Sequence, residues 1–271
     1  MAFARRIPAW YAVILPNLVM LAFLWFFVSR VQSDARAVWR LLRAFYPVFF
    51  IWAAYSQTGL MNHLVSPGFH DDWLRQLDRA VFGCDPAADF SRAFPQPVVA
   101  EIMHGVYFSY YLLFPGLGLL FYLRRAPQVL DDYFSALCRA FYFCCLVFVL
   151  FPAAGPVELK SVAPSGSVFP GVMELIYRWF ELPGGAFPSS HVAVAVVTLV
   201  YSVKHAPRWM VLYLPGCLGV LPATVYCSYH YGVDVIGGVA VALGALAIAR
   251  NRKNPVGRRG RRDLPVGQPD R

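Results

Sequence analysis

"VIGGVAVALGALAIARNRK" (residues 235–253) joins an unbroken apolar run to a cluster of basic residues. The first fifteen residues of this stretch are all aliphatic or glycine, and Arg250, Arg252 and Lys253 follow at once. A membrane-spanning helix needs about 20 consecutive, mostly apolar residues. Basic residues directly after such a run are typical of the cytoplasmic end of a span. The stretch therefore predicts a transmembrane helix over about 232–250.

The whole chain of 271 residues has the composition of a membrane protein. It is 58% hydrophobic and only 14% charged, with a mean hydropathy of +0.51, whereas a soluble domain carries about 25% charged residues. We expect an all-α fold, a polytopic transmembrane helix bundle of six or seven spans. The run at 189–204 is short for a full span. The candidate spans cover residues 10–29, 41–58, 98–123, 131–152, 189–204, 209–228 and 232–250.

The charges between the spans predict the orientation of the bundle. Basic segments at 30–43, 124–132 and 204–208 alternate with the more acidic loops 59–97 and 153–188. The positive-inside rule then places the basic segments and the C-terminal tail in the cytoplasm, and both acidic loops outside. With seven spans the N-terminus, which carries Arg5 and Arg6, lies outside, so the first apolar run could instead be re-entrant or interfacial.

One domain accounts for almost the whole chain in this scheme. We expect residues 1–250 to form a single integral membrane domain with a catalytic core at about 130–250. Residues 251–271 are expected to form a basic, disordered cytoplasmic tail. The net charge of +9 is assigned to contact with the anionic bilayer surface rather than with nucleic acid.

Polar, titratable residues stand at the mouths of two apolar runs, "GAFPSSHVAVAVV" (185–197) and "YCSYHYGVDVIGG" (226–238). Both mouths fall on the predicted outer side, together with residues 151–160. His230 and Asp234 are four residues apart, so one helical turn brings them to the same face. A carboxylate beside an imidazole fixes its tautomer and stabilises its cation after the other nitrogen attacks an electrophile.

The start of the apolar run at 185–197 offers an anion site. Ser189 or Ser190 can cap the helix that begins there, and the free N–H groups of its first turn favour a bound phosphate. His191 lies in that first turn, where it can pass a proton to or from the phosphate. Two histidines and an aspartate at such a helix end predict phosphoryl transfer.

These motifs resemble those of the type 2 phosphatidic acid phosphatase superfamily. "PSSH" (188–191) is similar to the family's PSGH-type motif, and "HYGVD" (230–234) to its His-x-x-x-Asp motif. Their order and separation match as well. Within the superfamily, "FPAAGP", "GAFPSSH" and "HYGVDVIGG" look most like the inositol phosphorylceramide synthase-like branch. The resemblance covers residues 130–250 well and 60–130 more loosely.

The resemblance implies the role of each residue. His230 would be the nucleophile that forms a phosphohistidine, Asp234 would orient it, and His191 would act as general acid and then as general base. Neither a metal nor another cofactor is implied. The enzyme would take a phosphoryl-containing group from a phospholipid and pass it to a lipid alcohol or to water.

Two phosphate-clamping motifs of the phosphatase branch are missing. "PAAGPVELK" (152–160) lacks the Lys-x6-Arg-Pro pattern, and Ala223 and Thr224 stand where that branch has Ser and Arg. The groups left to neutralise the negative charge of the transferred phosphoryl group are Lys160, Arg178, the helix N-terminus, and the hydroxyls of Ser189 and Ser190. This departure favours a transferase over a simple phosphatase. The alternative is a non-catalytic membrane transporter or scaffold that retains the fold.

Six further expectations concern residues around this core. Residues 71–83 are expected to form an amphipathic interfacial helix, and 152–188, rich in Pro and Gly, a non-helical loop. We assign Tyr107, Tyr110 and Tyr111 to an interfacial aromatic belt. "HDDW" (70–73) is a poor metal-ligand set. Glu101 lies at the outer edge or lines a cavity, and Gly237 and Gly238 either permit close helix approach or leave room for an acyl chain.

Overall fold

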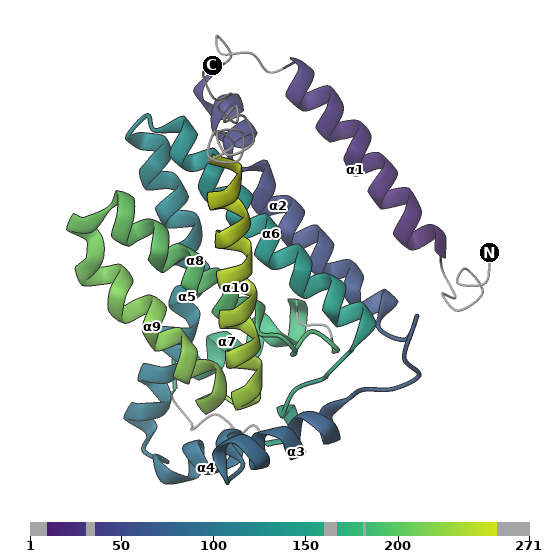
Figure 1. Cartoon of the computed structure of the whole chain (residues 1–271), viewed down its shortest axis with the longest axis vertical. Coiled ribbons are helices and arrows are strands. Elements are labelled where there is room, and N and C mark those ends of the chain that lie inside the picture. The colour runs from purple at the N-terminus through teal and green to yellow at the C-terminus, as the bar shows by residue number, and fades with distance from the viewer. Residues whose placement is uncertain (1–9, 31–35, 160–166, 181–182, 254–271) are drawn as a thin grey trace, which may run out of the picture.

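The structure, a computed structural model, describes residues 10–30, 36–159, 167–180 and 183–253. Within these ranges the chain is all-α, with ten α-helices, two short 3-10 helices and one isolated β-bridge (Figure 1). The predicted fold class is confirmed. The helices are α1 (Trp10–Arg30), α2 (Ala37–Met61), α3 (Asp71–Phe82), α4 (Pro86–Ala93), α5 (Pro97–Leu123), α6 (Pro127–Leu150), α7 (Phe169–Phe180), α8 (Ser190–His205), α9 (Met210–Tyr226) and α10 (Gly232–Lys253).

Several helices have the length and composition of membrane spans. Helices α2, α5, α6, α9 and α10 are each long and apolar enough to cross a bilayer, and α1 contains the shorter apolar stretch Val13–Phe27. Helix α8 has 16 residues, about 24 Å at 1.5 Å per residue, which is shorter than a hydrocarbon core of about 30 Å. Most of the apolar surface of the five long helices faces outward, since at most 44% of each apolar window is buried. The chain is an integral, multi-pass membrane protein.

Proline marks the starts of three helices. Helices α4, α5 and α6 begin at Pro86, Pro97 and Pro127, where the missing N–H group would have had no partner within the helix. Only three residues separate α5 from α6, so the two helices run in opposite directions. The guanidinium of Arg124 donates to the carbonyl of His205 (3.3 Å). The turns after α5 and α8, both predicted to be cytoplasmic, therefore lie side by side.

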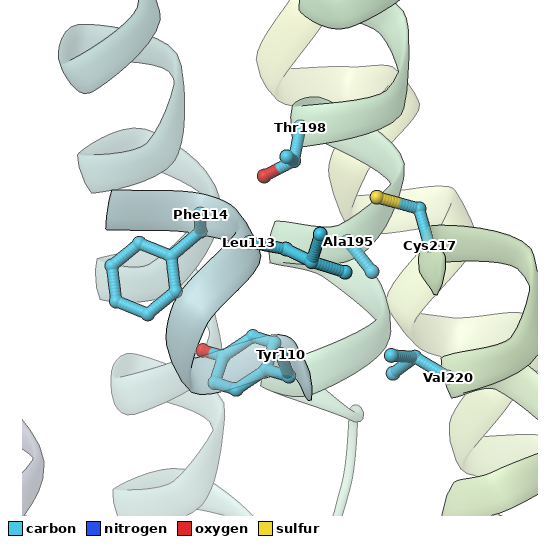
Figure 2. A pocket seen from close by; sticks show the side chains of 7 residues that line it. All are labelled: Tyr110, Leu113, Phe114, Ala195, Thr198, Cys217 and Val220. Carbon is cyan, nitrogen blue, oxygen red and sulfur yellow. The ribbon is translucent and has the colours of Figure 1, made fainter. Parts of the chain in front are cut away.

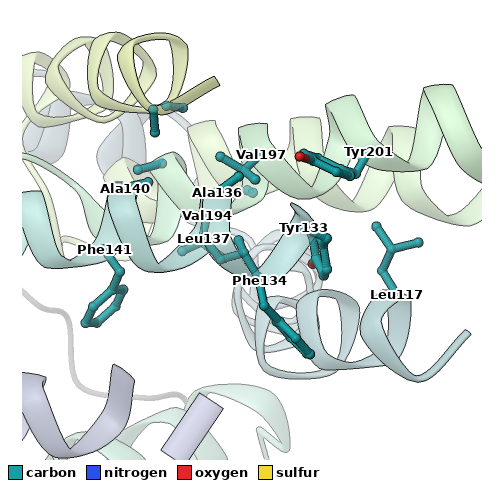
Figure 3. Packing of buried hydrophobic residues seen from close by; sticks show 14 of the residues in the cluster. Leu117, Tyr133, Phe134, Ala136, Leu137, Ala140, Phe141, Val194, Val197 and Tyr201 are labelled. Carbon is teal, nitrogen blue, oxygen red and sulfur yellow. The ribbon is translucent and has the colours of Figure 1, made fainter. Parts of the chain in front are cut away.

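Helix α6 packs at the centre of the bundle, against α2, α5, α8 and α10. Small residues such as Ala136 and Ala140 allow close approach, and larger side chains such as Phe134 fill the remaining space (Figure 3). The hydroxyl of the fully buried Tyr133 donates to the carbonyl of Phe114 (2.8 Å) and lies 3.0 Å from the hydroxyl of Thr198. The hydroxyl of Tyr133 thus finds its partners within the bundle, as a polar group in lipid requires.

Helix α10 approaches the start of α8 very closely. A Cβ at Gly238 would lie 2.5 Å from the carbonyl oxygen of Ser189 and 2.9 Å from Cβ of Val192, and one at Gly237 would lie 3.0 Å from Cβ of Pro188. The predicted close helix approach at these glycines is confirmed. The space beside them is filled by α8 and the residue before it, so it does not hold an acyl chain.

Segments 59–97 and 153–188 contain more helix than the sequence suggests. The predicted helix over 71–83 is confirmed as α3, which lies with α4 across one end of the bundle (Figure 1). The prediction of a non-helical loop over 152–188 is wrong, because α7 covers residues 169–180. Phe169, Met173 and Tyr177 repeat every four residues along α7, and Met173 is fully buried. Burial of this apolar face outweighs the Pro and Gly on either side.

Candidate active site

The segments that precede α8 and α10, and the one that follows α6, meet at one end of the bundle. The N–H of Ala186 donates to the carbonyl of Ala153 (3.0 Å), and the N–H of Ser189 donates to the carbonyl of Asp234 (3.0 Å). The prediction that these three segments share one surface is confirmed for the described residues, which on the first segment extend to Leu159.

His230 is held in one orientation by two acceptors. Its Nδ1 lies 2.9 Å from the carbonyl oxygen of Ala186 and 3.3 Å from Oδ2 of Asp234. Because a carbonyl can only accept, Nδ1 carries the proton and the lone pair is on Nε2. Asp234 is fully buried, and its Oδ2 also accepts from the N–H of Tyr231 (2.8 Å). This geometry turns Nε2 of His230 towards His191.

His191 faces His230 across the site. Its Nδ1 lies 3.5 Å from Nε2 of His230, and the two rings are 5.6 Å apart between centroids. On its far side, Nε2 of His191 lies 3.0 Å from the hydroxyl of Tyr107 on α5. The structure thus brings the three predicted catalytic residues, His191, His230 and Asp234, into one cluster. Their chemical roles remain predictions.

The N-terminus of α8 opens into this cluster. Ser189 is the N-cap, and its hydroxyl accepts from the N–H of Val192 (3.3 Å). Ser190 and His191 follow in the first turn, where N–H groups have no carbonyl partner within the helix. These groups and the helix dipole suit an anion. Of the predicted phosphate ligands, Ser189 and Ser190 lie here, whereas Lys160 falls outside the described residues.

The cluster is poor in positive charge. Among the residues that the structure describes, no Lys or Arg side chain forms a hydrogen bond or an ion pair with the two histidines or with Asp234. Arg178, the other predicted source of charge, is exposed near the end of α7. Neutralisation of a bound phosphate would therefore rest mainly on N–H groups and hydroxyls in this part of the chain.

The N-terminus of α10 is already occupied by a carboxylate from α3. Oδ2 and Oδ1 of Asp78 accept from the N–H groups of Gly232 (2.9 Å) and Val233 (2.8 Å), and Asp78 is fully buried. Burial raises the pKa of this carboxyl, and the two backbone donors act in the opposite direction. Asp78 fixes the first turn of α10, the turn that carries Asp234. The sequence analysis did not identify this residue.

A second aspartate of α3, Asp71, forms hydrogen bonds to the loop after α6. Oδ2 and Oδ1 of Asp71 accept from the N–H groups of Ala154 (2.9 Å) and Gly155 (2.8 Å), and Oδ1 also lies 3.1 Å from the hydroxyl of Tyr231. These bonds occupy the carboxylate that "HDDW" would have offered to a metal. No cluster of His, Cys, Asp and Glu suited to a metal is found among the described residues. Asp71 and Asp78 are seven residues apart, two helical turns, and therefore lie on the same face of α3.

The tyrosines of α5 are not an interfacial belt. Tyr107 is fully buried and Tyr110 is 7% exposed, so for these two residues that prediction is wrong. The rings of Tyr107 and Tyr110 lie 4.9 Å and 4.6 Å from the ring of His191. They line the helix interface instead, because α5 turns this face towards α8 and α9.

Glu101 lies near the N-terminal end of α5 and lines a cavity. Its carboxylate accepts from the N–H groups of Val168 and Phe169 (3.0 Å to the latter), at the start of α7. It also lines a largely apolar groove of about 480 Å³ between α5, α7 and α9. Of the two alternatives drawn from the sequence, the cavity-lining one is confirmed, and the other stays a prediction because it depends on the orientation of the bundle.

Comparison with known proteins agrees with this geometry. The PAP2 superfamily profile matches residues 72–248. The phosphoinositol dihydroceramide synthase of Bacteroides thetaiotaomicron is 38% identical over 60 residues, and the inositol phosphorylceramide synthase catalytic subunit aur1 of Schizosaccharomyces pombe is 30% identical over 71 residues. These matches cover 21% and 26% of this chain, and 20% and 17% of the relatives.

No solved structure shows a significant match. The family profile nevertheless covers α3 to α10 and all three residues of the histidine–aspartate cluster. With that coverage, the chain belongs to the PAP2 superfamily.

Proposed function

We propose that this protein is a membrane lipid phosphotransferase or phosphatase that works through a phosphohistidine on His230. The observation that carries the proposal is the arrangement of the buried Asp234 and His230 with the half-buried His191. Nδ1 of His230 is held by acceptors, and its Nε2 faces Nδ1 of His191 at 3.5 Å. An oriented nucleophile beside an acid–base group is the arrangement that covalent phosphoryl transfer requires.

The first half-reaction breaks the bond between phosphorus and the lipid alcohol. Nε2 of His230 attacks the phosphorus, and the leaving oxygen takes the bond's electron pair and a proton from Nδ1 of His191. The products are phosphohistidine, a free lipid alcohol and a neutral His191. Asp234 stabilises the positive charge that the substituted His230 ring carries.

The second half-reaction returns the enzyme to its starting state. His191 takes a proton from an acceptor hydroxyl at Nδ1, and the acceptor oxygen attacks the phosphorus. The bond between phosphorus and Nε2 of His230 breaks, and its electron pair returns to the ring. An alcohol acceptor gives a new phospholipid, whereas water gives free phosphate or a phospho-headgroup.

We assign the protein to the transferase side of this choice. Both named relatives are synthases by their printed names, and no Lys or Arg contacts the cluster among the described residues. The helices around the site are apolar, and a site that excludes water favours an alcohol acceptor. The substrates we propose are a phospholipid donor and a lipid alcohol such as a ceramide or diacylglycerol.

Charge distribution supports a site on the non-cytoplasmic face. The acidic segments lie at the end of the bundle that carries the histidines, and the basic turns after α5 and α8 are in mutual contact. The positive-inside rule then places those turns and the tail in the cytoplasm.

The test is turnover of labelled phospholipids by the purified protein, with and without ceramide or diacylglycerol. We expect the wild type to form product lipid and, after acid-free quenching, to carry acid-labile phosphate. His230→Ala should abolish both signals, whereas the exposed His63 provides a matched control in His63→Ala. Normal activity in His230→Ala would refute the covalent role. No turnover by the wild type would favour a transporter or scaffold, and predominant hydrolysis at saturating acceptor would make the enzyme a phosphatase.

A further inference from the structure

Tyr107 lies directly behind His191, on the side away from His230. It is fully buried on α5, and its hydroxyl lies 3.0 Å from Nε2 of His191. The same hydroxyl lies 3.2 Å from the hydroxyl of Tyr177 on α7. His191 therefore has a defined partner at each ring nitrogen, with Tyr107 at Nε2 and His230 at Nδ1.

Only one nitrogen of His191 can serve the proposed chemistry. Nδ1 faces Nε2 of His230 at 3.5 Å, so a phosphorus bonded to that nucleophile lies on the Nδ1 side of His191. The proton must leave Nδ1 in the first half-reaction and return to Nδ1 in the second. Nε2 must therefore keep its own proton throughout. If neutral His191 carried its single proton on Nδ1 instead, Nδ1 could not accept a proton and His191 could not act as a base.

We propose that Tyr107 is a positioning residue for His191. Its phenol oxygen accepts a hydrogen bond from Nε2–H of His191 and thereby keeps Nδ1 as the nitrogen that gives and takes the proton. This inference rests on the proposed function and adds a residue to it. Tyr107 does for His191 what Asp234 does for His230, since each side chain fixes the tautomer of one imidazole from behind.

The two partners differ in charge, and the difference fits the two roles. A carboxylate stabilises an imidazolium-like ring, which suits the nucleophile because it carries positive charge after attack. A neutral phenol accepts the Nε2–H bond without stabilising the cation to the same degree, so His191 can still release its proton. A carboxylate in place of Tyr107 would hold the proton on the group that has to donate it.

The surrounding side chains fix the direction of the phenol. Its own proton can be donated to Tyr177, whose ring stacks on Tyr229 at 3.9 Å between centroids. Tyr229 directly precedes His230, and Glu101 holds the start of the helix that carries Tyr177. The orientation of Tyr107 thus depends on α7, the helix that the sequence did not reveal.

A merely structural role for this tyrosine can be separated from a positioning role by the leaving group. A lipid alcohol leaves poorly without a proton, whereas 4-nitrophenol leaves as a stable anion and gains little from a general acid. Loss of a positioned acid should therefore slow the first substrate class and spare the second. Misfolding or a weakened site would slow both.

The experiment compares Tyr107→Phe with Tyr110→Phe in the full-length protein. Tyr110 lies one helical turn along α5, and its ring also packs near His191, but it lines an apolar void with Leu113, Ala195 and Val220 (Figure 2). Both variants lose one buried hydroxyl from the same helix. The donor pairs are dioctanoyl phosphatidic acid with 4-nitrophenyl phosphate, and dioctanoyl phosphatidylinositol with 4-nitrophenyl inositol phosphate. Release of the leaving alcohol is measured in a single turnover, with the pair that the wild type accepts.

We expect Tyr107→Phe to slow release of the lipid alcohol by about 100-fold, the lower end of what a positioned acid contributes, and to slow release of 4-nitrophenol less than about threefold. Tyr110→Phe should change neither rate by more than about threefold. Equal losses with both leaving groups in Tyr107→Phe, or no loss with either, would overturn the inference while leaving the proposed function intact. A wild type that releases neither alcohol would refute the proposed function itself.

Discussion

Replacement of Asp78 by asparagine tests whether α3 holds the catalytic end of α10 in place. The side chain accepts two backbone N–H groups, at 2.9 Å and 2.8 Å, in a fully buried position. Asparagine retains one acceptor oxygen and presents an NH2 group to the other backbone donor. One buried N–H then loses its partner, at a cost of about 1–3 kcal/mol. Asp78→Ala would leave both backbone N–H groups without an acceptor and should lower the free energy of unfolding further.

The change in stability is measurable as a shift in the unfolding temperature in detergent micelles, followed by tryptophan fluorescence. For a protein of this length, 1 kcal/mol corresponds to about 2–4 °C, so Asp78→Asn should lower the midpoint by roughly 2–12 °C. Asp72→Asn is the matched control, because Asp72 is exposed one residue into the same helix. It should lose only the helix-dipole interaction, about 0.3–1 kcal/mol.

The pH dependence gives an independent measurement on the same variant. Burial raises the pKa of Asp78, so between its unfolded and folded pKa values the folded state binds more protons than the unfolded state. The contribution of Asp78 to the free energy of unfolding must therefore decrease as pH rises through that interval. Asp78→Asn should remove this component, and Asp72→Asn should retain it. If the two variants have the same midpoints and the same pH profiles, α3 does not anchor α10 and the reasoning fails.

Two further predictions concern the packing and the orientation of the bundle. Gly238→Ala places a methyl group 2.5 Å from the carbonyl oxygen of Ser189, so it should lower the free energy of unfolding by about 1–3 kcal/mol through overpacking and should also reduce activity. Gly244→Ala, where nothing lies within 4 Å, should leave stability unchanged or raise it. Equal effects of the two variants would contradict the close approach of α10 to the start of α8. Cys84 is exposed between α3 and α4, on the side that the proposed orientation places outside the cell, so a membrane-impermeant maleimide should label it on intact cells. Arg208→Cys in a Cys84→Ser background should stay unlabelled. The reverse pattern would invert the proposed orientation.

The fold class and the three clustered residues could be predicted because their signals are local. An apolar run of the right length identifies a span without knowledge of its neighbours. The spacing of His230 and Asp234 is one helical turn, and the serines before His191 are helix-capping residues. Each of these features is set by fewer than about 20 consecutive residues, so it can be recognised before the packing is known.

The supporting residues could not be predicted because their partners are distant in the chain. Tyr107 meets His191 across 84 residues, and Asp78 meets Gly232 across 154. A buried tyrosine on an apolar helix and an interfacial tyrosine look alike in sequence, since both stand among apolar residues. The sequence does not reveal helix α7 for a related reason, because its stability comes from burial of one face against α5 and not from its own propensity.

Two helix N-termini meet at the histidine cluster, and only one of them is open to an anion. The first N–H groups of α10 donate to Asp78. A second anion at this helix end would find these donors already used and would be repelled by the carboxylate of Asp78. The first turn of α8 is capped only by Ser189. A bound phosphate should therefore lie on the α8 side, with His191 in the same turn and Nε2 of His230 opposite. In the proposed mechanism, a phosphate held there would lie beside Nε2 of His230 and Nδ1 of His191. This asymmetry arises because Asp78 of α3 occupies one helix N-terminus and not the other.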